Sequence, residues 1–144
     1  MLTANDIALV RASFAKVLPI KNAAADLFYG RLFEIAPQLR PMFPKDLKEQ
    51  KAKLMAMIAA AVGGLHDLNI LVPHVKALGA RHAGYGVTVA HYAIVADALM
   101  WTLERGLGDA FTPEVRSAWA KVYHVLAATM QAGAEQVANV QAAE

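Results

Sequence analysis

The sequence predicts an all-α domain, on the evidence of its composition and its residue patterning. Ala, Leu, Met, Lys and Glu dominate, and the alternation of β-branched and polar residues that marks strands extends nowhere beyond a few positions. Hydrophobic residues make up 57% of the 144 and charged residues 18%, which excludes a disordered chain. Because this length fits one domain and no linker or repeat interrupts it, we expect residues 1–144 to form a single domain.

Capping and proline signals predict the first two helices. Thr3 followed by Asp6 resembles a capping pair and predicts a helix that runs to about Leu18. A second helix is expected from about Lys21 to Ile35, and Pro37 then predicts a change of direction.

The middle of the chain is divided by prolines and glycines. Pro41 to Pro44 predicts an irregular corner, because proline disfavours the helical conformation in the residue before it. The segment from Leu47 to Leu65 places apolar residues at i, i+3, i+4 and i+7, which predicts a long helix. Pro73 is expected to begin a short helix that ends near His82, where Gly84 and a second glycine follow.

Two further helices complete the predicted fold. One is expected from Val89 to Glu104, ending before Gly106. Thr112 as cap and Pro113 as first helical residue predict a last helix to about residue 137.

Composition also narrows the classes of function. The formal charge of +2 gives too weak a field to argue for a nucleic-acid partner. The absence of cysteine excludes a disulfide scaffold, a thiolate metal site and a cysteine nucleophile. The N-terminus carries no secretory signal pattern, and the longest apolar run, Leu54 to Leu65, is shorter than the roughly 18 residues of a membrane span. We therefore expect a cytoplasmic, soluble domain with no membrane span.

Common catalytic motifs are absent from the sequence. There is no Gly-x-Ser-x-Gly, no phosphate-binding Walker loop and no His-Glu-x-x-His. Gly84 and Gly86 form a Gly-x-Gly pair, but Val89 stands where a dinucleotide-binding loop needs a third small residue, and no strand precedes it.

Four side chains depart from simple packing, although each has an ordinary explanation when taken alone. His82 ends a predicted helix, where a histidine either bonds the last carbonyls or ligates a metal. Tyr29 reads as a core tyrosine, and Gln50 as the polar edge of an amphipathic helix. Phe43, between two prolines, reads as a hydrophobic plug.

In combination and in this order, these residues resemble a globin, and specifically the bacterial single-domain globins related to the globin half of flavohaemoglobins. The segments that carry the resemblance are Leu27–Phe33, Pro37–Phe43, Leu78–His82, His91–Val95 and Ala118–Tyr123. The resemblance spans essentially the whole chain. It implies the globin fold, a three-over-three helical sandwich around one haem b.

The resemblance also implies how haem is held. His82 matches the proximal histidine, which ligates iron through Nε2 while its Nδ1–H donates to a carbonyl one turn back, here that of Leu78. Phe43 matches the corner phenylalanine that packs flat against the porphyrin. Lys53 or Lys51 is expected to meet a haem propionate, but the two point about 200° apart, so at most one can do so.

On the distal side, Tyr29 and Gln50 match the family's hydrogen-bond donors, and Leu54 its apolar wall. Bound oxygen carries negative charge on its outer atom. Two neutral donors in a dry pocket therefore imply high oxygen affinity and slow release, with a smaller gain for CO.

Tyr92 matches a proximal tyrosine that, in flavohaemoglobin-like proteins, is joined by a glutamate of the last helix. Here the matching position is Ala134, and Glu135 is displaced by about 100° around the helix. We expect the chain to lack this glutamate, which weakens the case for peroxidase-like activation. The remaining histidines are expected to be structural or exposed: His66, His74, His91 and His124.

The resemblance favours a haem protein that binds O2 reversibly, for storage, delivery or scavenging, with CO and NO as further small ligands. The alternative is NO dioxygenase activity; because the sequence ends after the last globin helix, an external reductase is then expected. A third hypothesis, a haem-free globin-like regulator, leaves the polar set of His82, Tyr29 and Gln50 without a purpose. Redox or gas sensing is a fourth.

Overall fold

The computed structural model describes residues 2–143, and the side chains of residues 2–136. In this part of the chain there are helices and connecting turns but no strand, which confirms the all-α prediction. The elements are α1 (Ala4–Val17), η1 (Leu18–Ile20), α2 (Lys21–Ile35), η2 (Pro37–Met42), α3 (Lys48–Gly63), α4 (Leu68–Gly84), α5 (Val89–Leu107), η3 (Gly108–Ala110) and α6 (Pro113–Ala143).

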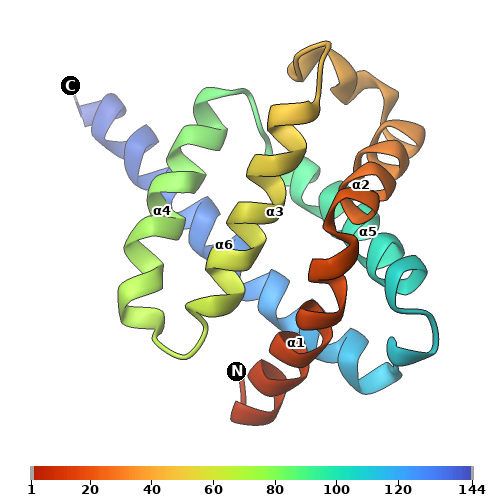
Figure 1. The fold of residues 1–144 in the computed structure, drawn as a ribbon. Helices are drawn as coiled ribbons and strands as arrows, with labels where there is room; N and C mark the ends of the chain where they lie inside the picture. The colour runs from red at the N-terminus through yellow and green to blue at the C-terminus, as the bar shows by residue number, and fades with distance from the viewer. Residues whose placement is uncertain (1, 144) are drawn as a thin grey trace.

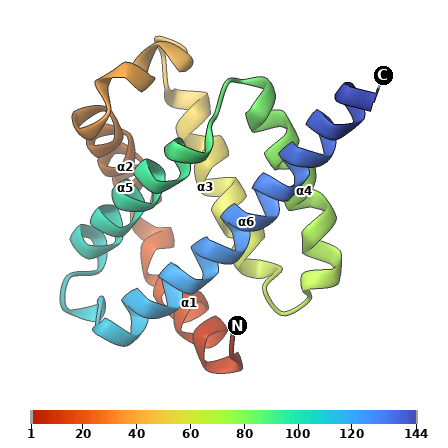
Figure 2. The same cartoon turned by 180° about the vertical axis from the view of Figure 1, so that it is seen from behind.

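The helices cross one another in two layers. In Figure 1, α3 lies in front of α6, with α4 on one side and α2 on the other. Behind them α6 runs diagonally across the molecule, and α5 lies beside its first half (Figure 2). The principal contacts join α4 and α1 to α6, and α2 to α5.

No single helix of the described residues is long and apolar enough to cross a membrane. The bent pair Leu68–Gly84 and Val89–Ala110, taken together, is long and apolar enough by length and composition alone.

Predicted caps are confirmed at two helix starts. The side chain of Thr3 accepts a hydrogen bond from the Asp6 N–H, and the Asp6 carboxylate accepts one from the Thr3 N–H, both at 3.0 Å. At the start of α6, the hydroxyl of Thr112 accepts from the Val115 N–H at 3.2 Å.

Three helix boundaries differ from the prediction. α4 begins at Leu68, so Pro73 lies inside it rather than at its start. Proline removes one N–H there, and the carbonyl that loses this partner belongs to Asn69, which is exposed and open to water. α5 continues through Gly106 and ends at Leu107, and its C-cap is Gly108, whose φ of 56° suits glycine. α6 runs beyond residue 137 to Ala143.

Two hydrophobic clusters fill the interior. The larger one joins α1, α2, α3, α5 and α6 around Trp119, whose indole N–H donates to the hydroxyl of Ser13 at 2.8 Å. The smaller one lies between α2 and α5 and includes Phe28, Tyr29 and Leu32. Because the smaller cluster contains Tyr29, the packing of α2 against α5 positions part of the candidate site.

Candidate haem and gas-ligand site

The structure brings the two predicted distal donors together. Tyr29, on α2, is only 3% exposed, and its hydroxyl accepts a hydrogen bond from Gln50 Nε2 on α3 at 3.2 Å. Burial raises the pKa of Tyr29, so the phenol stays protonated and remains a donor. Gln50 is half-buried at the edge of the same region. The pair therefore presents neutral donors next to apolar side chains.

Aromatic rings surround this pair. Tyr29 stacks on Phe33 with ring centroids 5.9 Å apart, and Phe43 meets both rings edge-on at 5.6 Å and 5.4 Å. Phe43, the predicted plug, thus packs directly against Tyr29. Leu54, the predicted distal wall, packs on the same cluster.

Arg40 holds the corner that carries Phe43, a role that motif reasoning missed. Its guanidinium donates to the backbone oxygens of Phe43, Pro44 and Lys45 at 3.3, 2.9 and 2.9 Å. It also lies 5.2 Å from the ring centroid of Phe33. The available signal was an arginine just before a proline-rich corner, where carbonyls have no helical partners.

His82, the predicted iron ligand, lies near the end of α4, and its ring is fixed by the backbone. Nδ1 lies 2.8 Å from the backbone oxygen of Leu78. A carbonyl only accepts, so Nδ1 carries the proton and the lone pair of neutral imidazole lies on Nε2. This is the tautomer and orientation that an iron-ligating histidine needs, so the residue present fits a haem.

The structure also shows the surroundings of Tyr92, the tyrosine that the resemblance assigns to the proximal side, and of Glu135. The hydroxyl of Tyr123 donates to the backbone oxygen of Tyr92 at 2.6 Å, and burial raises the pKa of both phenols. Tyr92 lines an open groove of about 490 Å³ between α5 and α6. Glu135 is exposed, and within the described side chains no hydrogen bond joins it or His82 to Tyr92.

The two lysines considered for a haem propionate differ in their interactions. Lys51 Nζ lies 2.8 Å from a carboxylate oxygen of Asp26, whereas Lys53 is exposed. His91, expected to be structural or exposed, caps α5: its Nδ1 accepts from the Thr88 N–H at 3.0 Å. The Thr-x-x-His spacing at a helix start was the signal for this cap. The other three histidines of the prediction are exposed: His66, His74 and His124.

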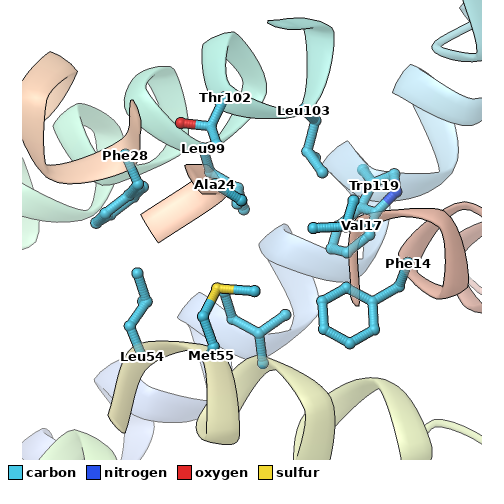
Figure 3. Close-up of a pocket in the computed structure, with 11 residues that line it drawn as sticks. Phe14, Val17, Ala24, Phe28, Leu54, Met55, Leu99, Thr102, Leu103 and Trp119 are labelled. Carbon is cyan, nitrogen blue, oxygen red and sulfur yellow. The ribbon is translucent and has the colours of Figure 1, made fainter. Parts of the chain in front are cut away.

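A small apolar cavity lies behind Leu54. Figure 3 shows Leu54 and Phe28 at one end of it and Trp119 at the other. Its volume of about 20 Å³ is enough for one molecule of the size of water. Thr102, a polar residue in its wall, donates its hydroxyl to the Ala98 carbonyl at 2.8 Å. The lining therefore offers little to water and suits a small apolar guest. The sequence carried no signal for it, because its walls come from five helices.

Comparison with known proteins agrees with this geometry. The family model described as Globin matches residues 26–130. A neuroglobin of Tetraodon nigroviridis is 31% identical over 146 residues, with 92% of each chain covered. A flavohemoprotein of Bacillus subtilis is 29% identical over 88% of this chain, which spans 33% of that longer protein. Among solved structures, the chain is similar to an engineered carbene transferase made from RmaNOD of Rhodothermus marinus, a protein assigned as a nitric oxide dioxygenase. The two structures superpose with a TM-score of 0.86, at 28% sequence identity and with 99% of each chain covered. The chain belongs to the globin family, and its fold is the globin fold.

Proposed function

We propose that this globin holds one haem b through His82 and binds O2 reversibly on the face lined by Tyr29 and Gln50. Membership of the globin family implies haem binding, and haem supplies the iron at which a diatomic gas binds. The observation that carries the proposal is the bond between His82 Nδ1 and the Leu78 carbonyl, which leaves Nε2 as a ligand. In this proposal residues 1–144 act as a single globin domain.

The Tyr29–Gln50 pair is suited to a polar gas ligand. Because Gln50 Nε2 donates to the Tyr29 oxygen, the hydrogen of the Tyr29 hydroxyl remains available for another acceptor. A ligand with a negative outer atom is such an acceptor, and the bond from Gln50 polarises the tyrosine as a donor. CO is less polar and gains less. The pair therefore favours O2 over CO.

Three further side chains complete the proposed haem site. Phe43, packed between the distal aromatics and the corner, offers a planar apolar face to the porphyrin. Leu54 forms the apolar wall of the ligand side. Lys51 already pairs with Asp26, so Lys53 is the better placed of the two lysines for a propionate.

Absorption spectra of the purified protein, together with substitution of His82, test the assignment. We expect a Soret band that shifts with CO after reduction and a stable spectrum of the O2 adduct in air. His82→Ala removes the only proposed iron ligand and should abolish stable haem retention. His74→Ala, an exposed histidine on the same helix, is the matched control and should retain haem. Full haem content in His82→Ala would overturn the ligand assignment, and a chain that takes up no haem would favour the regulator hypothesis.

A second candidate function is NO dioxygenation, favoured by the structural likeness to the Rhodothermus marinus protein and the sequence likeness to a flavohemoprotein. In this reaction NO, O2 and one electron combine to give nitrate, so each turnover needs a reductant. The flavohemoprotein extends well beyond the part matched here, and an external reductase would be the electron source for this chain. Nitrate should be measured per haem, with NO, O2, NADH and a flavin reductase present. Many equivalents would support the enzyme, whereas one equivalent with every reductase would exclude it.

A further inference from the structure

α4, the helix that carries His82, rests on α6 at a crossing where two glycines meet opposing backbones. A Cβ atom added at Gly79 would lie 1.9 Å from the backbone oxygen of Met130. A Cβ added at Gly133 would lie 2.0 Å from the backbone oxygen of Lys76. Each helix therefore uses the space of the other's missing side chain.

The need for glycine here is one of space and not of backbone conformation. Gly79 and Gly133 lie inside helices, and positive φ occurs in the described residues only at Gly86 and Gly108. Glycine inside a helix carries a conformational cost relative to alanine. A larger residue does not fit at either position without moving a helix, because the nearest atoms are main-chain atoms, which cannot rotate away as a side chain would. The close packing of the two helices therefore offsets the conformational cost of the two glycines.

The position of α4 depends chiefly on α6, although Leu68 and Leu71 at its start also pack on the larger hydrophobic cluster. The principal contacts of α4 are with α6. Only two of its residues are buried, and they are Val75 and Gly79 itself. Leu78, whose carbonyl orients His82, directly precedes Gly79. A displacement of α4 at the crossing therefore moves the histidine together with the carbonyl that anchors it.

We propose that Gly79 and Gly133 are positioning residues that set how far His82 stands from α6, and so the position of its Nε2 relative to the iron. This inference rests on the proposed haem binding. An alanine at either position forces α4 away from α6 by about 1 Å or more to restore an ordinary contact. The imidazole follows, and the bond that it makes to iron is placed under a different strain.

The test compares Gly79→Ala, Gly133→Ala and the double variant with Gly84→Ala. Gly84 lies on the same helix, and its added Cβ meets nothing within 4 Å. In the haem-loaded, reduced protein without gas ligand, resonance Raman spectroscopy reports the iron–histidine stretching band. We expect each glycine variant at the crossing to shift this band and to accelerate haem loss about tenfold, while Gly84→Ala matches the wild type. Because one retreat of α4 accommodates both methyl groups, the double variant should shift the band little more than the larger single shift.

Two outcomes would overturn the inference. One is an unchanged band in folded Gly79→Ala and Gly133→Ala proteins. The other is an equal shift in Gly84→Ala, which would show a general response of α4 to alanine. Thermal unfolding of the haem-free protein separates this inference from the proposed function, because it needs no haem. A wild type that takes up no haem would refute both the haem function and the role of the glycines in placing His82. Lower midpoints in both crossing variants, with less than additive loss in the double variant, would then assign the crossing a packing role alone.

Discussion

Two hydrogen bonds determine which atoms of His82 and Tyr29 remain available to a bound group. The bond from His82 Nδ1 to the Leu78 carbonyl leaves a lone pair on Nε2, and the bond from Gln50 to Tyr29 leaves a phenolic hydrogen free to donate. One side therefore offers a base for a metal and the other offers donors for an anion-like atom. In the proposed function, the first group would hold the haem iron and the second would stabilise a ligand with a negative outer atom, so each residue has a separate observable.

Tyr29→Phe should raise the O2 dissociation rate. The variant keeps the ring among the aromatics and loses only the hydroxyl, so one neutral hydrogen bond of about 1 kcal/mol disappears and the rate rises roughly five- to tenfold. Stopped-flow mixing of the O2 adduct with CO measures this rate. Because burial raises the pKa of Tyr29 above its ordinary 10.0, the wild-type rate should stay flat as the pH rises toward that value. Tyr85→Phe, at a tyrosine that is 68% exposed, is the control. An unchanged rate in Tyr29→Phe would mean that the hydroxyl does not meet the ligand.

Residue-scale features could be predicted wherever a short pattern carries them. His82, Tyr29, Gln50 and Phe43 were proposed as site residues because their types and order form a recognisable set, and the predicted bond from His82 to Leu78 is present. Arg40 could not be found in the same way. Its partners are backbone oxygens of the corner, so the only signal for it is an arginine just before a proline-rich segment, which does not say which carbonyls it meets.

At the scale of elements, the cap of the first helix also lowers the pKa of a carboxyl group. The Thr3 N–H donates to the Asp6 carboxylate, and this bond, more than the Thr3 hydroxyl or Lys121, lowers the pKa of Asp6 below its ordinary 3.8. A group whose pKa is lower in the folded than in the unfolded chain stabilises the fold above the unfolded value. That contribution is lost as the pH falls through the folded value.

Asp6→Asn should therefore destabilise the protein at pH 7 and have a diminishing effect in acid. Urea unfolding of the variant and the wild type, from pH 7 down to pH 3, measures the difference in unfolding free energy. We expect this difference to shrink as the pH falls below about 4, because the wild-type carboxylate then becomes protonated. Asp97→Asn, at an exposed position on α5, removes the same charge without a cap and serves as control. A difference that stays constant with pH would contradict the role of the Asp6 charge.

The helix starts that have side-chain caps were predicted correctly. The boundaries predicted at a proline or a glycine were wrong where the helix continues through that residue. The Thr3 and Thr112 caps are local, so four residues specify each of them. Pro73 predicts a helix start, yet α4 begins at Leu68 and continues through the proline, because the carbonyl that loses its partner belongs to an exposed residue, Asn69. Gly106 likewise stays helical and Gly108 ends α5. Whether a helix survives such a residue depends on solvent and packing, which the local sequence does not contain.

At the scale of the whole molecule, the fold combines a broad core with one helix, α4, that depends chiefly on a single partner, α6. α1 enters the larger hydrophobic cluster with Val10, Phe14 and Val17, and Trp119 ties α6 to it through Ser13. α4 contributes few buried residues and depends on its crossing with α6. Neither this crossing nor the cavity behind Leu54 could be predicted, since both arise from residues far apart in the chain.

Removal of haem should therefore loosen α4 before the rest of the molecule. A ligand that binds only the folded form stabilises it by mass action, and proposed iron ligation at His82 adds a second attachment to a helix held chiefly by α6. Amide hydrogen exchange of the haem-free protein, read by mass spectrometry, should be fastest among helices in the peptides of residues 68–84 and slow in those of residues 4–17, where the larger cluster protects the backbone. With haem bound, protection of residues 68–84 should rise while that of residues 4–17 changes little. Equal protection of the two segments in the haem-free protein would contradict this prediction. It would mean that the crossing of Gly79 and Gly133 alone holds α4 as firmly as the core holds α1. The site would then be already formed before haem binds.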